Sequence, residues 1–152
     1  MPWKIAVGAD NAGYGYKEAL KQLLEGDARV ASVIDVGVGA PDDGTNYPSV
    51  AVAAARKVAA GDVDRALLIC GTGLGVAISA SKVKGVRAVT AHDLYSVQRS
   101  VLSNNAQVLC MGERVIGLES AKALIDVWLG LQFDPTSASA AKVDEICSYE
   151  GD

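Results

Sequence analysis

Short apolar runs alternate with longer amphipathic segments along the whole chain, and this alternation limits the fold more than any other feature. The runs predicted as strands are Lys4–Ala9, Val30–Val36, Ala66–Cys70, Arg87–Ala91 and Val108–Met111. The segments predicted as helices are Tyr16–Glu25, Tyr47–Ala60, Gly75–Lys82, Asp93–Leu102, Leu118–Trp128 and Ser139–Tyr149. Five βα units predict an α/β fold, a Rossmann-like three-layer domain whose five-stranded parallel sheet has helices on both faces.

Length and charge narrow the class of protein. The 152 residues suit a single domain spanning residues 1–152. The net charge of −4 and the lack of a basic stripe argue against nucleic acid as a partner. No apolar run approaches the ~20 residues of a membrane span, so no membrane partner is expected.

The cysteines and the N-terminus bear on the compartment. The three cysteines are widely spaced and form no CxxC pair, which predicts neither a disulfide framework nor a metal site. The first strand pattern begins at once, without a signal-peptide pattern before it. These features together predict a cytoplasmic protein.

The stretch CGTGLGVAIS places Cys70 at the end of the third predicted strand, with three glycines directly after it. Gly71, Gly73 and Gly75 permit a tight turn and close approach of the backbone to a ligand. The stretch lacks the sixth-position glycine of a dinucleotide fingerprint, the Lys–Ser/Thr of a P-loop and the arginine of a cysteine phosphatase loop. Backbone amides at such a turn favour an anion or a thiolate, so Cys70 is a candidate base or nucleophile.

Cys70 also has a simpler interpretation, as a small buried residue of a core strand. Its position at the carboxyl end of a strand, where α/β proteins bind ligands, favours the functional interpretation. Cys110 and Cys147 have no glycine turn beside them, and both are interpreted as structural.

Further polar residues fall at the same predicted edge of the sheet. Asp10 and Asn11 follow the first strand, where they bind a ligand, cap the next helix, or do both. Adjacent first and third strands would bring Asp10 close to the Cys70 turn. His92, the single histidine, follows the fourth strand and is a second-tier candidate for proton transfer, since a lone histidine is more often structural. Asp93 is placed to cap the helix after it.

Three long segments of the chain resemble the ribose-5-phosphate isomerase B and galactose-6-phosphate isomerase (RpiB/LacAB) family. They are IAVGADNAG, VDRALLICGTGLGVAISASKVKGVRAV and HDLYSVQRSVLSNNAQVLCMGERVIGLESAK. They stand in the family's order and cover nearly the whole chain, so they are specific for the family and less specific for the substrate.

The resemblance implies an aldose–ketose isomerase that acts, without metal or other cofactor, on a phosphorylated sugar through a cis-enediolate. Cys70 matches the base that moves a proton between C1 and C2, and Thr72 lies where it could assist proton movement on the hydroxyls. The residues implied to bind substrate are Asp10, Asn11, Gly71, Gly73, Leu74, Gly75, Asn104, Arg114 and Lys142. The family builds each active site from two subunits. This implies a homodimer or a dimer of dimers, with the C-terminal helix, about 139–149, packed on the partner.

The chain departs from the family pattern at three places. Asn11 replaces a histidine associated with phosphate binding, and Lys142 stands alone near the position of a missing arginine pair. Ser103 replaces the histidine that opens the sugar ring, and a serine cannot act as that acid–base near neutral pH.

Two substrates and two alternative functions stay open. A tetrose 4-phosphate, erythrose or erythrulose 4-phosphate, cannot close a furanose and needs no ring opening, which fits Ser103. Ribose 5-phosphate stays open because His92 could supply the lost acid–base. A non-catalytic sugar-phosphate-binding protein is disfavoured by the retained Cys70 turn, and a nucleotide-binding module by the missing phosphate-binding motifs.

Overall fold

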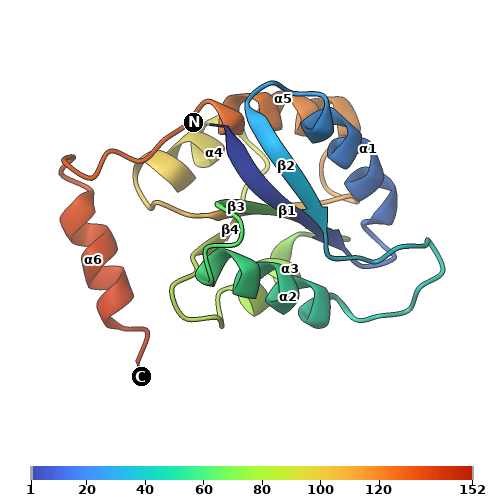
Figure 1. Cartoon of the computed structure of the whole chain (residues 1–152), viewed down its shortest axis with the longest axis horizontal. Helices are drawn as coiled ribbons and strands as arrows, with labels where there is room; N and C mark the ends of the chain where they lie inside the picture. The colour runs from blue at the N-terminus through green and yellow to red at the C-terminus, as the bar shows by residue number, and fades with distance from the viewer. Residues whose placement is uncertain (1, 152) are drawn as a thin grey trace.

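The structure is a computed structural model that describes residues 2–151, and it confirms the α/β fold (Figure 1). The strands are β1 (Trp3–Ala9), β2 (Val30–Asp35), β3 (Arg65–Cys70), β4 (Ala88–Thr90) and β5 (Val108–Gly112). The helices are α1 (Tyr14–Glu25), α2 (Tyr47–Ala59), α3 (Leu74–Ala80), α4 (Leu94–Leu102), α5 (Leu118–Leu129) and α6 (Ala140–Ser148). The strands form one parallel sheet in the order β2-β1-β3-β5-β4.

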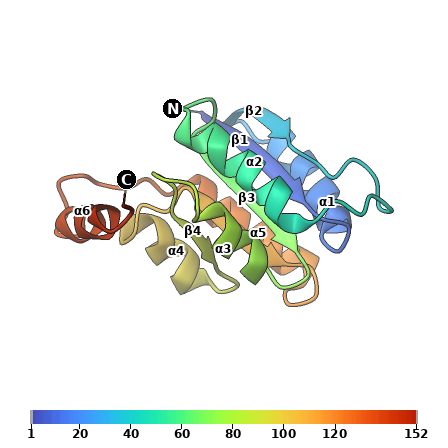
Figure 2. The ribbon, with the colours of Figure 1, turned by 90° about the horizontal axis from the view of Figure 1, so that it is seen from below.

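Helices cover both faces of the sheet, as Figures 1 and 2 show. One face packs against α1, α4 and α5 around large buried side chains such as Leu20, Ile125 and Trp128. The other packs against α2 and α3 through small residues, including Ala51, Ala55 and Ala80. Small side chains let helices lie close to a sheet.

Strand β3, like β5, is buried along its whole length. All its side chains are buried, as the apolar run predicts for a strand covered on both faces. The strand begins one residue earlier than the prediction because Arg65 already pairs with Ile5 of β1; its side chain is 5% exposed. The other elements match their predicted segments within two residues at each end; β1 begins one residue earlier, at Trp3, and α1 two residues earlier, at Tyr14.

The order of the strands fixes where a ligand can bind. Strand β2 lies on one side of β1, and β3, β5 and β4 follow on its other side, so the direction of strand addition reverses at β1. This reversal leaves a crevice outside the carboxyl ends of β1 and β3, which is where open α/β sheets bind ligands. Asp10 follows β1 and Cys70 ends β3, so the expected proximity of these two segments is confirmed.

Helix α6 stands apart from the three layers, beyond the β4 edge (Figures 1 and 2). Its last turns touch the segment before β4: Glu150 accepts a hydrogen bond from the Gly85 amide at 3.1 Å, and Arg87 donates to the Cys147 sulfur at 3.3 Å. Most of its surface is exposed, with Ile146 45% and Tyr149 83% accessible.

Candidate active site

A small cleft of about 220 Å³ opens at the carboxyl ends of β1 and β3. It is lined by Asp10, Ala12, Tyr47, Cys70, Gly71, Thr72, Gly75 and Arg114. The cleft thus gathers a carboxylate, a thiol, two hydroxyls and a guanidinium, which are groups suited to a small, anionic, polyhydroxylated ligand.

Cys70 lies at the base of this cleft, 4% exposed. Its sulfur accepts a hydrogen bond from the backbone N–H of Gly73 at 3.1 Å. Gly73 has φ +78°, and a Cβ there would lie 2.7 Å from the Met111 carbonyl carbon. Only glycine fits this turn, so the glycine is part of what aims the amide at the sulfur.

Thr72 and Thr90 stabilise the same turn. Thr72 is exposed at the cleft, and its hydroxyl accepts a hydrogen bond from the Leu74 amide at 3.2 Å. The Thr90 hydroxyl donates to the Gly73 carbonyl at 2.6 Å, from the end of β4. Leu74 does not line the cleft; its side chain is 57% exposed on the outer side of α3.

Tyr47 is a cleft residue that the sequence analysis missed. It is the first residue of α2 and lies against Gly75, where an added Cβ would meet the tyrosine ring at 2.2 Å. Gly75 therefore makes room for the Tyr47 ring at the edge of the cleft. The available signal was Pro48, which marks a helix start directly after the long loop between β2 and α2.

Arg114 reaches the cleft from the loop after β5. Its guanidinium passes over Gly71, with Nη1 3.2 Å from where a Cβ of that glycine would stand. The Arg114 amide donates to the Gly71 carbonyl at 3.1 Å, which holds this loop on the Cys70 turn. Among residues 2–151 no carboxylate forms an ion pair with Arg114, so its charge is available to an anionic ligand.

Asp10 lines the cleft from the loop after β1. One carboxylate oxygen of Asp10 accepts hydrogen bonds from the amides of Ala12, at 3.0 Å, and Gly13, at 3.1 Å. This is an Asx turn that precedes α1, and the N-cap of that helix is Gly13 rather than either polar residue. Asn11 is exposed beside the cleft and is not among the residues that line it.

His92 faces the backbone rather than the cleft. Its Nε2 accepts a hydrogen bond from the Gly112 amide at 2.8 Å, at the end of β5. Burial lowers the pKa of His92, against the opposing effect of neighbouring Asp93, which favours the neutral ring that this bond requires. The contact makes His92 a support for the strand end. Asp93 caps α4 as expected, accepting from the Ser96 amide at 2.8 Å.

Asn104 and Lys142, which were predicted to bind substrate, lie away from this cleft, as does Ser103. Ser103 follows α4, where its hydroxyl accepts a hydrogen bond from Arg99 at 2.7 Å. Asn104 lines a separate pocket of about 540 Å³ between β4 and the end of α6. Lys142 is exposed on α6 itself. Within one chain the structure therefore brings together Asp10, Cys70, the glycine turn and Arg114, and leaves these three outside.

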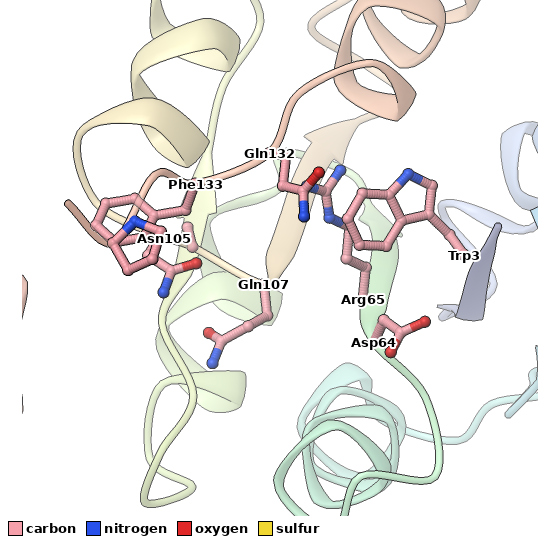
Figure 3. A pocket seen from close by; sticks show the side chains of 9 residues that line it. Trp3, Asp64, Arg65, Asn105, Gln107, Gln132 and Phe133 are labelled. Carbon is pink, nitrogen blue, oxygen red and sulfur yellow. The ribbon is translucent and has the colours of Figure 1, made fainter. Parts of the chain in front are cut away.

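Another cavity, of about 390 Å³, lies at the other end of the strands, beside the first residues of β1 and β3 (Figure 3). Its central group is Arg65, whose guanidinium stacks 3.8 Å from the Trp3 ring centre. The same guanidinium donates to the carbonyls of Trp128, at 2.7 Å, and Leu131 at the end of α5. Burial lowers the pKa of Arg65 to about 10. These contacts make Arg65 a structural cation that holds the end of α5.

The structure also bears on metals and membranes. Within the described part of the chain, no three His, Cys, Asp or Glu side chains are grouped to hold a metal ion. Across residues 2–151, every helix is too short or too polar to span a bilayer.

Comparison with known proteins agrees with this geometry. The profile of the family described as Ribose/Galactose Isomerase matches residues 5–146. The chain is 76% identical to D-erythrulose-4-phosphate isomerase 2 of Mycolicibacterium smegmatis, over 99% of both chains. It is 45% identical to ribose-5-phosphate isomerase B of Escherichia coli, over 86% of both chains. A solved structure of Clostridium thermocellum ribose-5-phosphate isomerase B superposes with a TM-score of 0.90, at 37% identity over 97% of both chains. The chain therefore belongs to the Ribose/Galactose Isomerase family of sugar-phosphate isomerases.

Proposed function

We propose that this isomerase interconverts a tetrose 4-phosphate aldose and ketose, with Cys70 as the proton-transfer base. The Cys70 thiolate removes the C2 proton of the aldose, and the resulting thiol returns a proton to C1 of the enediolate. Proton movement between O1 and O2 completes the ketose, and Thr72 stands beside this path. Arg114 binds the phosphate, Asp10 the sugar hydroxyls, and the amides of the turn from Gly71 to Gly75 the enediolate oxygen.

The preference for a tetrose rests on one observation: the single imidazole of the chain is already engaged. The Nε2 atom of His92 accepts a hydrogen bond from the Gly112 amide. At the position where the family has its ring-opening histidine, this chain has Ser103, whose hydroxyl is bound by Arg99. A furanose needs an acid–base group with a pKa near neutrality to open its ring. A tetrose 4-phosphate has its O4 esterified and presents no such ring. The 76% identity to a D-erythrulose-4-phosphate isomerase supports the same choice.

The active site is further proposed to be completed by a second copy of the chain. Ser103, Asn104 and Lys142 lie outside the cleft of their own chain, at the β4 edge and on α6. Exposed apolar side chains of α3 and α6 surround this region: Leu74, Ile78, Ile146 and Tyr149. A homodimer or dimer of dimers would cover these side chains and bring Asn104 and Lys142 to the partner's cleft.

The proposed compartment is the cytoplasm. All three cysteines are free, and Cys70 must stay reduced to act as a base.

The substrate proposal is tested by measuring kcat/KM for D-erythrulose 4-phosphate and ribose 5-phosphate in both directions. We expect the tetrose to be the better substrate, and Ser103→His to raise kcat/KM for the pentose more than for the tetrose. Ser96→His, an exposed change on the first turn of the same helix, is the control and should alter neither. A wild-type protein that prefers ribose 5-phosphate would contradict the tetrose proposal, and turnover of neither sugar would indicate a non-catalytic binding protein.

The shared site is tested by mixing two inactive variants, Cys70→Ala and Asn104→Ala, after partial unfolding and refolding together. In a mixed dimer one of the two sites is intact, so activity should recover to about a quarter of the wild-type value. Light scattering gives the oligomeric state of each variant. Failure to recover activity, with mixed dimers formed, would contradict a site built from two chains.

A further inference from the structure

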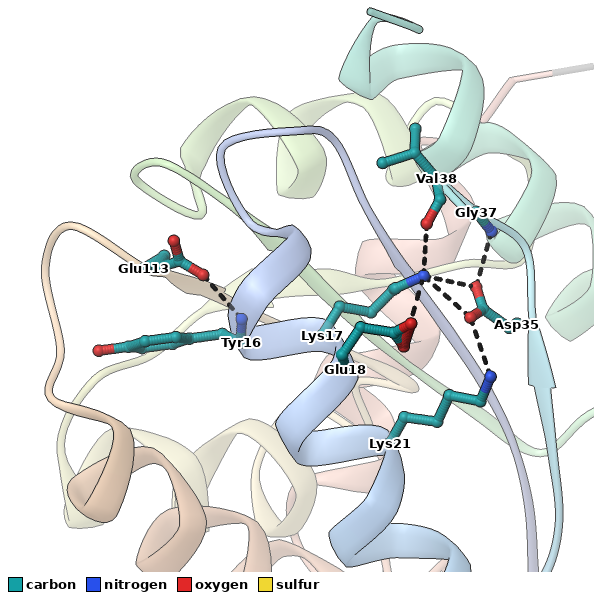
Figure 4. Close-up of polar contacts among 8 residues, drawn as sticks. All are labelled: Tyr16, Lys17, Glu18, Lys21, Asp35, Gly37, Val38 and Glu113. Carbon is teal, nitrogen blue, oxygen red and sulfur yellow. Dashed lines mark hydrogen bonds and ion pairs between the residues drawn. The ribbon is translucent and has the colours of Figure 1, made fainter. Parts of the chain in front are cut away.

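Helix α1 begins beside the cleft without a cap of its own. Its N-cap is Gly13, which has no side-chain hydrogen bond to offer, and its first turn holds no acidic residue. The first amides of a helix have no partner within it and need an acceptor from elsewhere. Glu113 supplies one: its Oε1 accepts a hydrogen bond from the Tyr16 amide at 2.7 Å (Figure 4).

The approach of Glu113 depends on the sequence of α1. A Cβ on Gly15 would lie 3.2 Å from the Glu113 Oε1 atom, so glycine leaves room for the carboxylate. The Tyr16 hydroxyl makes a second tie, donating to the Ile116 carbonyl at 2.9 Å. The loop from Glu113 to Ile116 is therefore bound to α1 at both of its ends, with Arg114 between them.

Helix α1 is itself firmly held. Lys17 is 1% exposed, and its ammonium donates to both Asp35 oxygens, at 2.9 and 3.0 Å, and to the Val38 carbonyl (Figure 4). These contacts fix α1 to the end of β2. A loop attached to α1 consequently takes its position from a rigid element.

The backbone of Glu113 joins the same site from the other side. Its amide donates to the Cys70 carbonyl at 2.9 Å, and the Arg114 amide donates to the Gly71 carbonyl at 3.1 Å. Glu113 therefore connects α1, the Cys70 turn and Arg114. Its carboxylate is directed at the helix, and within residues 2–151 it forms no ion pair with the neighbouring Arg114.

We propose that Glu113 is a positioning residue that holds the Arg114 guanidinium over the cleft for the phosphate of the substrate. The proposal rests on the proposed function for the identity of the anion. A residue that only capped α1 would change the stability of the fold and leave phosphate affinity as it was. A residue that positions Arg114 must change phosphate affinity more than it changes the rate of proton transfer.

The experiment compares Glu113→Ala, Glu113→Gln and Tyr16→Phe with the control Glu119→Ala, whose carboxylate is 87% exposed on α5. KM and kcat are measured for D-erythrulose 4-phosphate, and the Kd of inorganic phosphate by calorimetry. For Glu113→Ala we expect KM and Kd to rise about tenfold, with kcat changed by less than about twofold, since ground-state and transition-state binding are lost together. Glu113→Gln keeps an oxygen acceptor and should restore most of the affinity. Tyr16→Phe should give a smaller shift in the same direction, and Glu119→Ala none.

Several results would overturn the proposal. A Glu113→Ala protein with lowered Tm but unchanged KM and phosphate Kd would show a structural cap alone. Glu113→Gln behaving as poorly as Glu113→Ala would exclude the hydrogen bond as the cause. If Glu113→Ala does not fold, the test rests on Glu113→Gln and Tyr16→Phe. A Tyr16→Phe protein that binds phosphate with the Kd of the wild type would then contradict the proposal. If the wild-type protein binds phosphate but does not turn over D-erythrulose 4-phosphate, only the proposed function is contradicted. If the wild-type protein binds no phosphate, the role of Glu113 proposed here is contradicted.

Discussion

The Cys70 sulfur lies 3.1 Å from the backbone nitrogen of Gly73, and this N–H donates to it. Gly73 has φ +78°, which directs the chain from this amide into α3. The contact holds the sulfur at the carboxyl end of β3, where Cys70 lines the cleft. The glycine turn therefore prepares the proposed base as well as making room for the substrate.

Two glycines of this turn should respond differently to alanine. Gly73→Ala places a Cβ 2.7 Å from the backbone of Met111 at a positive φ, so it should destabilise the fold by at least about 1–2 kcal/mol. Gly75→Ala instead meets the far end of the Tyr47 ring, which can rotate away. We expect Gly73→Ala to lower both Tm and kcat/KM. Gly75→Ala should lower kcat/KM with little change in Tm, and thermal unfolding and steady-state kinetics measure the two quantities. Equal loss of Tm in the two variants would count against this difference.

The contact of His92 with Gly112 predicts a pH dependence of stability. Burial lowers the pKa of His92 below its ordinary value of 6.5, so the unfolded chain takes up this proton first as the pH falls. The stabilisation is fully present above pH 6.5 and is lost as the pH falls through the lowered pKa. Denaturation of wild type and His92→Ala should show a difference in unfolding free energy that narrows from pH 8 to pH 5. A difference that widens over this range would contradict the assignment.

The three cysteines should differ in their reaction with iodoacetamide. Cys110 is fully buried, and burial raises the pKa of its thiol well above the ordinary value, so it should react only on unfolding. Cys147 is half-buried on α6 and should react whether or not substrate is present. Cys70 opens into the cleft and should be protected by sugar phosphate. Peptide mass mapping follows each site; equal protection of Cys70 and Cys147 would contradict this placement of the substrate.

The sequence predicted those features that depend on local pattern. The apolar run ending at Cys70 and the amphipathic segments between strands gave the α/β class, and the glycine turn identified the carboxyl edge of β3. Adjacent β1 and β3 then placed Asp10 beside Cys70. These are consequences of residue periodicity and of the way parallel strands end at one edge.

The features that the sequence did not reveal depend on long-range contacts. Tyr47 enters the cleft only because α2 packs beside α3, and nothing local marks its ring as lying on Gly75. The cap on α1 comes from Glu113, which lies 97 residues away from Tyr16 in the chain. The engagement of His92 by Gly112 likewise requires β4 and β5 to be neighbours. Pattern reasoning can place such residues at an edge, but it cannot pair their atoms.

The most direct test of Cys70 as the proton-transfer base is the exchange of substrate protons in deuterated water. Wild-type protein and Cys70→Ala are incubated with D-erythrulose 4-phosphate, and NMR follows both isomerisation and deuterium incorporation at C1. We predict that Cys70→Ala folds normally, keeps its phosphate affinity, and loses both signals by a factor on the order of 10²–10⁴. Isomerisation or deuterium incorporation by Cys70→Ala at nearly the wild-type rate would show that another group moves the proton.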